Sequence, residues 1–184
     1  MDSSTAAPVP VQPFRKILVP VDFSEHSRLA LEMATRLASD YAASLTLVYV
    51  YEPMAVAVPE GYLLFTEDQL DRMFEEFHRG LAEQKRAAEA AGALQVETQL
   101  LHGFAAGEIL SFAEQGGFDL IVMGSHGRRG LIHAFLGSVA ERVLRRAPCP
   151  VLTVRAHERD FVDARDDEDR RPAHVIESTV THHH

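Results

Sequence analysis

The stretch that decides the fold is FDLIVMGSHGRRGLIHAFLGSVAERVLRR, residues 118–146. Its first six residues form an apolar run of the kind found in a strand that is buried on both faces of a parallel sheet. Four glycines then fall within the fourteen positions from Gly124 to Gly137. A loop that only joins a strand to a helix needs about 2 to 6 residues. This longer loop is therefore expected to enclose a ligand.

The end of the same stretch predicts a helix from Ser138 to Arg146. The first amides of a helix have no acceptor within it and carry the positive end of its dipole, so they attract anions. Gly127 and the neighbouring glycines let the backbone approach such an anion closely. Phosphate is the expected ligand. A plainer reading stays open, because Ser138 and Glu141 form the S-x-x-E pattern of a capping box, which needs no ligand.

Two familiar phosphate loops are excluded. The chain has no G-K-[ST] sequence, and no G-x-G-x-x-G fingerprint follows the first expected strand. Arg128 can supply positive charge to phosphates, and the imidazole of His126 can contact a ligand. Both residue types are more often solvated or hydrogen-bonded within their own loop, so they are secondary candidates.

Apolar runs and helical periodicity alternate along the rest of the chain. The expected strands are 16–22, 44–52, 94–101, 118–124 and 149–155. The expected helices are one capped by Ser24, one from Thr66 to about Ala91, and those at 105–117 and 138–146. Parallel strands need crossover connections and helices supply them, which predicts an α/β fold: a doubly wound five-stranded parallel sheet with helices on both faces. The run at 94–101 alternates only in part and is expected nearer the sheet edge.

Finer expectations concern the first two helices and the segment between them. The first helix should bury a stripe of Leu29, Met33 and Leu37 with Ala30, Ala34 and Ala38. Thr66 and Gln69 have the spacing of a capping box. Residues 54–65, MAVAVPEGYLLF, show no clean period and contain Pro59 and Gly61. A loop with unusual apolar surface is therefore expected there.

Composition limits the class of protein. The chain has 184 residues, 46% hydrophobic and 24% charged, which suits one globular domain with additional terminal sequence. A net charge of -9 argues against wrapping nucleic acid or lying on anionic lipid. A single cysteine fits a reducing compartment, and no membrane span or signal peptide is expected, so the predicted location is cytoplasmic.

The loop also resembles a known signature. GSHGRRGLIHAFLGS has the spacing G-2x-G-9x-G-S, filled by Gly124, Gly127, Gly137 and Ser138. This pattern is similar to the ATP-binding signature of the universal stress protein (UspA-like) family, and ILVPVDFSEHS and APCPVLTVR resemble the family's first and last strands. The likeness implies a universal stress protein domain over residues 14–155. A flexible lead of residues 1–13 precedes it, and an acidic tail of residues 156–184, ending in HHH typical of a purification-tag remnant, follows it.

The resemblance implies the strand order 3-2-1-4-5, in which Asp22 faces the glycine loop across the switch point. In the family, an aspartate at this place holds the adenosine, and the backbone around Val50 borders the adenine. Met123 and Gly124 would line the base or ribose, while Gly127, Gly137, Ser138 and Val139 would hold phosphates. The full implied cofactor set is Val21, Asp22, Val50, Met123, Gly124, His126, Gly127, Arg128, Gly137, Ser138 and Val139. Without the resemblance, Asp22 would be read as a turn or capping residue.

The implied function is ATP binding by a homodimeric stress-response switch, with ADP or AMP as alternatives and Mg²⁺ accompanying ATP. The resemblance implies dimerisation through Pro150 to Arg155, and pairing would also protect an apolar edge strand. No catalytic residue is expected and at most slow hydrolysis, because no second acid lies near Asp22 in the sequence and none lies in the glycine loop.

Two other functions stay under consideration. A dimeric scaffold of the same fold that binds no nucleotide is the main alternative. A flavodoxin-like or receiver domain is disfavoured, because the neighbouring acids after the first strand and the lysine after the last strand are missing. No metal site and no nucleic-acid or membrane partner are expected.

Overall fold

The structure is a computed structural model, and it describes residues 14–52, 56–58, 61–63, 65–127 and 136–155. The lead of residues 1–13, the acidic tail of residues 156–184 and Arg128 lie outside the described residues.

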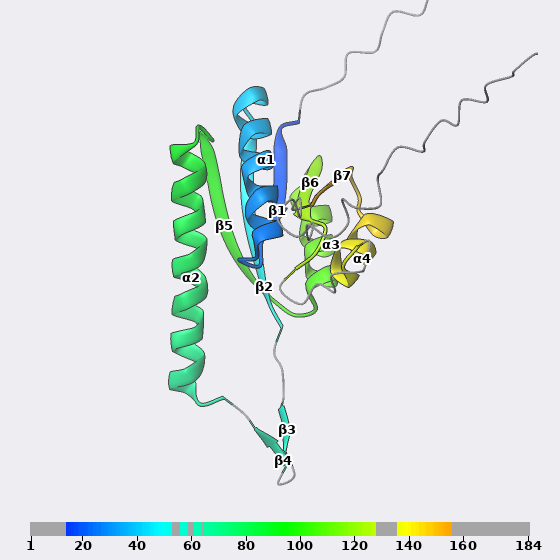
Figure 1. Cartoon of the computed structure of the whole chain (residues 1–184). Coiled ribbons are helices and arrows are strands. Elements are labelled where there is room, and N and C mark those ends of the chain that lie inside the picture. The colour runs from blue at the N-terminus through cyan, green and yellow to red at the C-terminus, as the bar shows by residue number, and fades with distance from the viewer. Residues whose placement is uncertain (1–13, 53–55, 59–60, 64, 128–135, 156–184) are drawn as a thin grey trace, which may run out of the picture.

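Five parallel strands form the central sheet (Figure 1). They are β1 (Lys16–Pro20), β2 (Ser44–Tyr51), β5 (Gln95–His102), β6 (Leu120–Gly124) and β7 (Val151–Val154). Their order is β5-β2-β1-β6-β7, and every neighbouring pair is parallel. The five predicted strands therefore lie in the order 3-2-1-4-5, and the expected fold class is confirmed. The run at 94–101 is an edge strand, as its partial alternation predicted.

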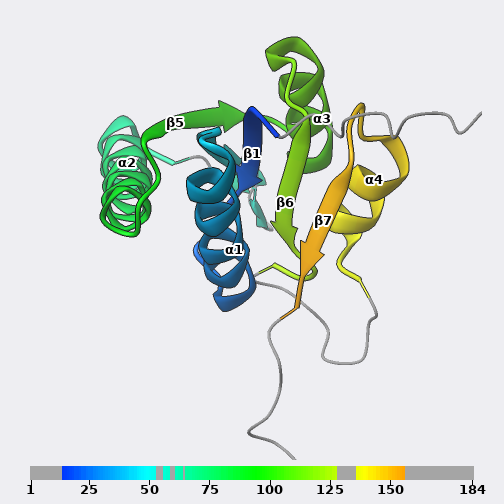
Figure 2. The same cartoon turned by 90° about the horizontal axis from the view of Figure 1, so that it is seen from above.

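Four helices cover the two faces of this sheet (Figure 2). They are α1 (Glu25–Tyr41), α2 (Glu67–Ala90), α3 (Ala105–Gly116) and α4 (Ser138–Arg146). Alternate residues of the buried strands point to opposite layers: Ile17 and Val19 pack with α1 and α2, whereas Leu18 packs with α3 and α4. No helix in the described part of the chain is long and apolar enough to cross a membrane.

Pro20 opens the sheet between β1 and β6. β1 pairs with β2 from Lys16 to Pro20, but it pairs with β6 only at Ile17 and Leu18. The amide of Val21 donates to the carbonyl of Val48 in β2 (2.8 Å), so the preceding residue would direct its N–H toward β6. Proline has no N–H to donate. The backbone ladder between β1 and β6 therefore ends before the carboxyl ends of these strands, beside the switch point, where open α/β sheets bind ligands.

The predicted loop at residues 54–65 was wrong in part. Its segments Val56–Val58 and Gly61–Leu63 form two short strands, β3 and β4, which pair in an antiparallel hairpin apart from the main sheet. Strands of three residues are shorter than the four to eight or so residues over which alternation can be recognised. Of the two residues that suggested a loop, Gly61 is the first residue of β4, and Pro59 lies outside the described residues.

The predicted stripe on α1 was also partly wrong. Ala30, Ala34 and Ala38 are buried as expected, but Met33 is 40% exposed. Thr35, which was not part of the predicted stripe, is buried. The hydroxyl of Thr35 donates to the carbonyl of Leu31 (2.8 Å), which satisfies the polar group inside the core.

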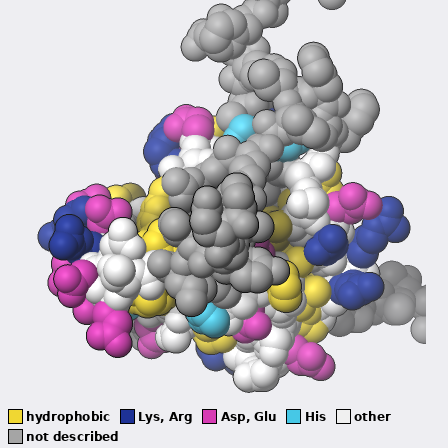
Figure 3. Space-filling view, turned by 90° about the horizontal axis from the view of Figure 1, so that it is seen from below, with side chains coloured by type: hydrophobic (Ala, Val, Ile, Leu, Met, Phe, Trp, Pro, Cys, Tyr) yellow, Lys and Arg dark blue, Asp and Glu magenta, His cyan; other side chains and the backbone are white. Residues whose placement is uncertain are grey.

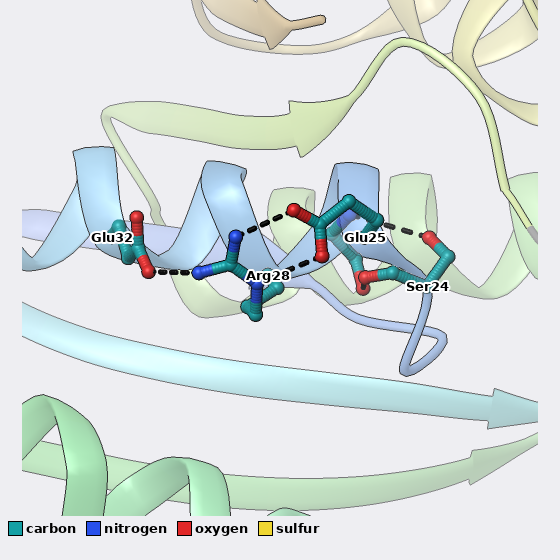
Figure 4. A network of polar contacts seen from close by, with 5 residues as sticks. Ser24, Glu25, Arg28 and Glu32 are labelled. Atoms are coloured by element: carbon teal, nitrogen blue, oxygen red, sulfur yellow. Dashed lines mark hydrogen bonds and ion pairs between the residues drawn. The ribbon is translucent and has the colours of Figure 1, made fainter. Parts of the chain in front are cut away.

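The predicted starts of α1 and α2 are confirmed. Ser24 caps α1, and Thr66 with Gln69 forms a complete capping box at α2. On the exposed face of α1, Arg28 pairs with Glu25 and with Glu32 (Figure 4). These pairs lie on the surface and position no part of the ligand crevice.

Candidate functional site

A cavity of about 950 Å³ lies at the carboxyl edge of the sheet and is lined by residues from the ends of β1, β2 and β6. Ten of the eleven residues expected to bind a cofactor line it: Val21, Asp22, Val50, Met123, Gly124, His126, Gly127, Gly137, Ser138 and Val139. The eleventh, Arg128, lies outside the described residues. In Figure 3, which views the molecule from below, hydrophobic side chains surround the grey centre, and Lys and Arg side chains lie toward the left and right edges. The fold thus gathers four distant segments of the chain around one pocket of ligand-binding size.

Asp22 connects the end of β1 to the glycine loop. Its Oδ1 accepts hydrogen bonds from the amide of Ser24 (3.0 Å) and from the hydroxyl of Ser24 (2.6 Å). Its Oδ2 lies on the other side, 2.5 Å from the place that a Cβ on Gly127 would occupy. Asp22 is therefore a turn residue, as the plain reading held. Its second oxygen nevertheless faces the glycine loop across the crevice.

Glycine is required at two places in this loop. A Cβ on Gly124 would stand 2.9 Å from the backbone carbon of His26, so a larger residue there would force β6 away from α1. A Cβ on Gly127 would collide with the carboxylate of Asp22. The loop is closed at its base by a hydrogen bond from the amide of Gly137 to the carbonyl of Ser125 (2.8 Å). The two ends of the loop are thus fixed at the pocket.

The start of α4 has no side-chain cap. The alternative reading of Ser138 and Glu141 as a capping box is contradicted: the N-cap is Gly137, and no side chain of the described residues bonds to the first turn. The helix begins one residue earlier than that box requires, and Glu141 instead accepts a hydrogen bond from Arg145 (3.1 Å). The first hydrogen bond within the helix runs from the amide of Glu141 to the carbonyl of Gly137 (2.9 Å). Among the described residues, the amides of the three positions before Glu141 have no acceptor, and they belong to the pocket wall.

The pocket has two further walls. Val50, Ile109 and Met123 provide apolar surface on the α3 and α4 side. Tyr49, Tyr51 and Phe77 provide aromatic surface on the α2 side, where the rings of Tyr49 and Phe77 stack with centroids 4.5 Å apart. Sequence reasoning missed this aromatic wall. The signal was present in VYVYE, because alternate strand residues share a face and so place Tyr49 and Tyr51 together.

Glu52 is a second residue that sequence reasoning missed. It follows the end of β2, and its Oε1 accepts a hydrogen bond from the amide of Ala105, the first residue of α3 (2.6 Å). The N-cap residue itself, Phe104, makes no side-chain cap. Glu52 therefore fills the positive start of α3 from a distant part of the chain, and no local pattern in the sequence marks such a contact.

His126 lines the glycine-loop end of the pocket, and the ring of His26 lies next to it. The rings of His26 and His126 are 5.4 Å apart, and Nδ1 of His126 is 3.2 Å from the hydroxyl of Ser125. Within the described part of the chain, no three His, Cys, Asp or Glu side chains are grouped closely enough to hold a metal ion. The residues that line the pocket offer hydrogen-bonding groups, acidic side chains and apolar surface.

The universal stress protein family model matches residues 13–155, which is most of the chain. The chain belongs to the universal stress protein family. A universal stress protein of Methanocaldococcus jannaschii is 38% identical over 144 residues, covering 77% of this chain and 82% of the relative. A universal stress protein of Bacillus subtilis is 37% identical over 147 residues, covering 77% of this chain and 99% of the relative.

Solved structures of the family share the fold. Another M. jannaschii universal stress protein is 32% identical, with a TM-score of 0.68 over 78% of this chain and 97% of that one. UspA of Lactobacillus plantarum is 26% identical, with a TM-score of 0.63 over 77% and 98% of the two chains. A universal stress protein solved in complex with cAMP is 25% identical, with a TM-score of 0.60 over 78% and 98%.

Proposed function

We propose that this universal stress protein binds an adenine nucleotide in the carboxyl-edge pocket, with ATP as the preferred ligand. It acts as a homodimeric switch and hydrolyses the nucleotide slowly or not at all. Bound ligand alters the surface that the domain presents to other proteins. The similar structure in complex with cAMP supports an adenine nucleotide as the class of ligand.

The observation that carries this proposal is the pairing of an acid with an uncapped helix start across one crevice. Asp22 lies on the β1 side, where a carboxylate oxygen can accept from the hydroxyls of a ribose. Ser138 and Val139 lie on the α4 side, where amides without acceptors and a hydroxyl suit phosphate oxygens. Gly127 lies near Asp22, and its lack of a side chain lets the protein backbone approach the ligand closely.

The base would lie against the apolar wall. The backbone of Val50 offers polar groups to the edge of an adenine, and Met123 and Ile109 offer contact to its face. A cavity of about 950 Å³ is at the upper end of the usual range for small-molecule sites. This volume suits a nucleoside triphosphate better than a nucleoside alone. The described residues form no metal cluster, so Mg²⁺ would be held mainly by the phosphates of the nucleotide.

The homodimer would form through β7. This strand is at the edge of the sheet, and Leu152 on it remains 38% exposed. Leu144 on the adjacent α4 is 50% exposed. An unpaired edge with apolar side chains invites pairing with another strand, and a two-fold mate of the same chain closes the assembly.

The proposed switch depends on ligand contacts at the two described ends of the glycine loop. Gly127 and Leu136 both line the pocket. A ligand that binds one conformation of the domain more tightly than another would shift the population toward it and so change the surface available to a partner.

Ligand binding and identity can be tested together. Native mass spectrometry and adenine absorbance of the purified protein reveal a co-purified nucleotide, and isothermal titration ranks ATP, ADP, AMP and cAMP. Gly127→Val is expected to weaken ATP binding about 100-fold, since a Cβ at this position meets Asp22, while the thermal melting temperature changes little. Equal ATP affinity in wild type and variant would rule out this loop as the binding site. Absence of binding by the wild type would favour the dimeric scaffold instead.

A further inference from the structure

Phe23 has a backbone conformation that its residue type seldom adopts. Its φ is 62°, in the left-handed region. Among the described residues, Ala42 is the only other non-glycine with a positive φ, and it ends α1, where a left-handed residue is common. Phe23 has no such explanation. A strained residue of this kind persists only when its surroundings hold it in place, and such residues gather at functional sites.

The ring of Phe23 is held between β2 and α2. It stacks on Tyr49 with centroids 4.9 Å apart and planes 18° apart. On α2, a Cβ added to Gly80 would lie only 2.7 Å from Cζ of Phe23, so the ring occupies the space that a side chain at Gly80 would fill. Phe23 nevertheless remains 37% exposed. The contacts with Tyr49 and Gly80 therefore fix the direction of this ring more than they bury it.

The left-handed residue also shapes the turn that aims Asp22. Phe23 lies between Asp22 and Ser24, and both hydrogen bonds to Oδ1 of Asp22 come from Ser24. An extended Phe23 would carry the amide of Ser24 away from the Asp22 carboxylate. With Oδ1 held in this turn, Oδ2 faces Gly127 across the crevice.

We propose that Phe23 is a positioning residue for the pocket. Its ring, clamped between Tyr49 and Gly80, holds the turn that keeps the Asp22 carboxylate directed toward Gly127. Helix α2, which provides no predicted cofactor residue, therefore sets the alignment of the acid through Gly80. This inference rests on the proposed adenine nucleotide site, because its consequence is measured there.

Substitutions at Phe23 separate positioning from packing. Phe23→Ala removes the clamp and keeps the cost of a positive φ, so the turn relaxes and adenosine affinity falls about tenfold. Phe23→Gly also removes the clamp, but glycine adopts a positive φ freely and retains more of the turn. The Gly variant is therefore expected to bind adenosine more tightly than the Ala variant. If Ala binds as tightly as Gly or more tightly, the proposal is wrong.

A double-mutant cycle shows whether Phe23 acts through Asp22. In an Asp22→Ala background, Phe23→Ala is expected to leave adenosine affinity unchanged, because the group that it positions is gone. An equal loss in both backgrounds would overturn the proposal. Gly80→Ala supplies an independent arm: it improves the helix propensity of α2 but displaces the ring, and it should weaken adenosine binding in the wild-type background only.

A readout without ligand and a matched control complete the test. The amide proton of Ser24, followed by NMR, should lose its hydrogen-bonded shift and exchange protection in Phe23→Ala and retain more of both in Phe23→Gly. An unchanged Ser24 amide in Phe23→Ala overturns the proposal. Phe112→Ala removes a half-buried ring that packs on Phe118, away from the pocket, and should leave adenosine affinity unaltered. A wild type that binds no adenine nucleotide contradicts the proposed function, whereas a binding wild type with an additive cycle contradicts only the role of Phe23.

Discussion

The starts of α3 and α4 differ, although each helix follows a strand end at the same edge of the sheet. At α3, Glu52 places a carboxylate oxygen 2.6 Å from the first amide nitrogen. At α4, Gly137 is the N-cap and no side chain of the described residues bonds to the first turn. Ser24 and Thr66 cap the other two helices. Among the described helices, a side chain of the protein thus satisfies the starts of α1, α2 and α3, and α4 is the one where we propose that a ligand anion binds.

A carboxylate introduced at the start of α4 would remove the difference between α3 and α4. Ser138→Asp should weaken ATP binding about 100-fold, because a fixed negative charge would occupy the place proposed for the phosphates. The same change should stabilise the fold by about 0.3–1 kcal/mol, since an acid in the first turn favours the helix dipole. Isothermal titration and urea denaturation measure the two opposite effects.

Ser138→Asn is the matched control for this charge. It has the size of the Asp variant without its charge, and its loss of ATP affinity should be about tenfold smaller than that of Asp. Equal affinities of the Asp and Asn variants would show that no phosphate lies at the start of α4.

Removing the acid at α3 tests the other side of the comparison. Glu52→Ala should lower the free energy of unfolding by about 0.5–2 kcal/mol, as the loss of a helix cap does. ATP affinity should rise about two- to threefold, because Glu52 also lines the pocket and repels phosphate. Glu114→Ala, at an exposed position of α3, is the control. Unchanged stability in Glu52→Ala would mean that its contact with Ala105 contributes nothing.

A smaller effect separates a capping hydroxyl from a ligand-binding one. Thr66→Ala removes half of the capping box of α2 and should cost about 1 kcal/mol of stability without altering ATP affinity. Ser138→Ala should do the reverse, with little change in stability and a several-fold loss of affinity. If chemical denaturation shows that both variants are destabilised equally, Ser138 is a cap after all.

The smallest effect concerns Glu25, an acid at the start of α1, a helix that Ser24 already caps. Glu25 lies in the first turn of α1, and its hydrogen bond with Arg28 lowers its pKa below the ordinary value. The pair therefore contributes stability above the unfolded-state pKa and loses it as the pH falls through the lowered folded-state pKa. The change in stability should be slight, because both side chains are about half exposed.

This last prediction is checked by NMR titration of the Glu25 carboxyl group. In Arg28→Gln the pKa of Glu25 should move back up toward its ordinary value, while ATP affinity stays the same. A pKa that remains low in the variant would assign the shift to the helix dipole rather than to Arg28.

Periodicity in the sequence predicted most of this fold. The buried runs at 16–22 and 118–124 lack an exposed face, which restricts them to the interior of a parallel sheet, and both are inner strands. The resemblance to the family supplied the strand order, which local patterns do not contain. The glycine spacing also selected a loop that lines the pocket, and a Cβ on Gly124 or Gly127 would meet a neighbouring atom at less than 3.0 Å.

The missed features depend on contacts between distant segments. Glu52 meets Ala105 only because β2 and β5 are paired, and the slot for Phe23 exists only because α2 packs near Tyr49. The capping-box pattern at Ser138 was a false local signal, since Gly137, whose amide bonds to the carbonyl of Ser125, is the N-cap and Ser138 is already the first residue of α4. Local rules fail at these positions because tertiary contacts override them.

Pro20 has one more consequence, which concerns the way the sheet comes apart. The backbone ladder from β1 to β6 covers two residue pairs, fewer than the ladder from β1 to β2, and it joins β5, β2 and β1 to β6 and β7. A ligand that contacts both Asp22 and Ser138 would link these two groups of strands, and its binding free energy would add to the stability of the folded sheet. The rate of amide hydrogen exchange in β6 and β7 would then fall as the nucleotide concentration rises.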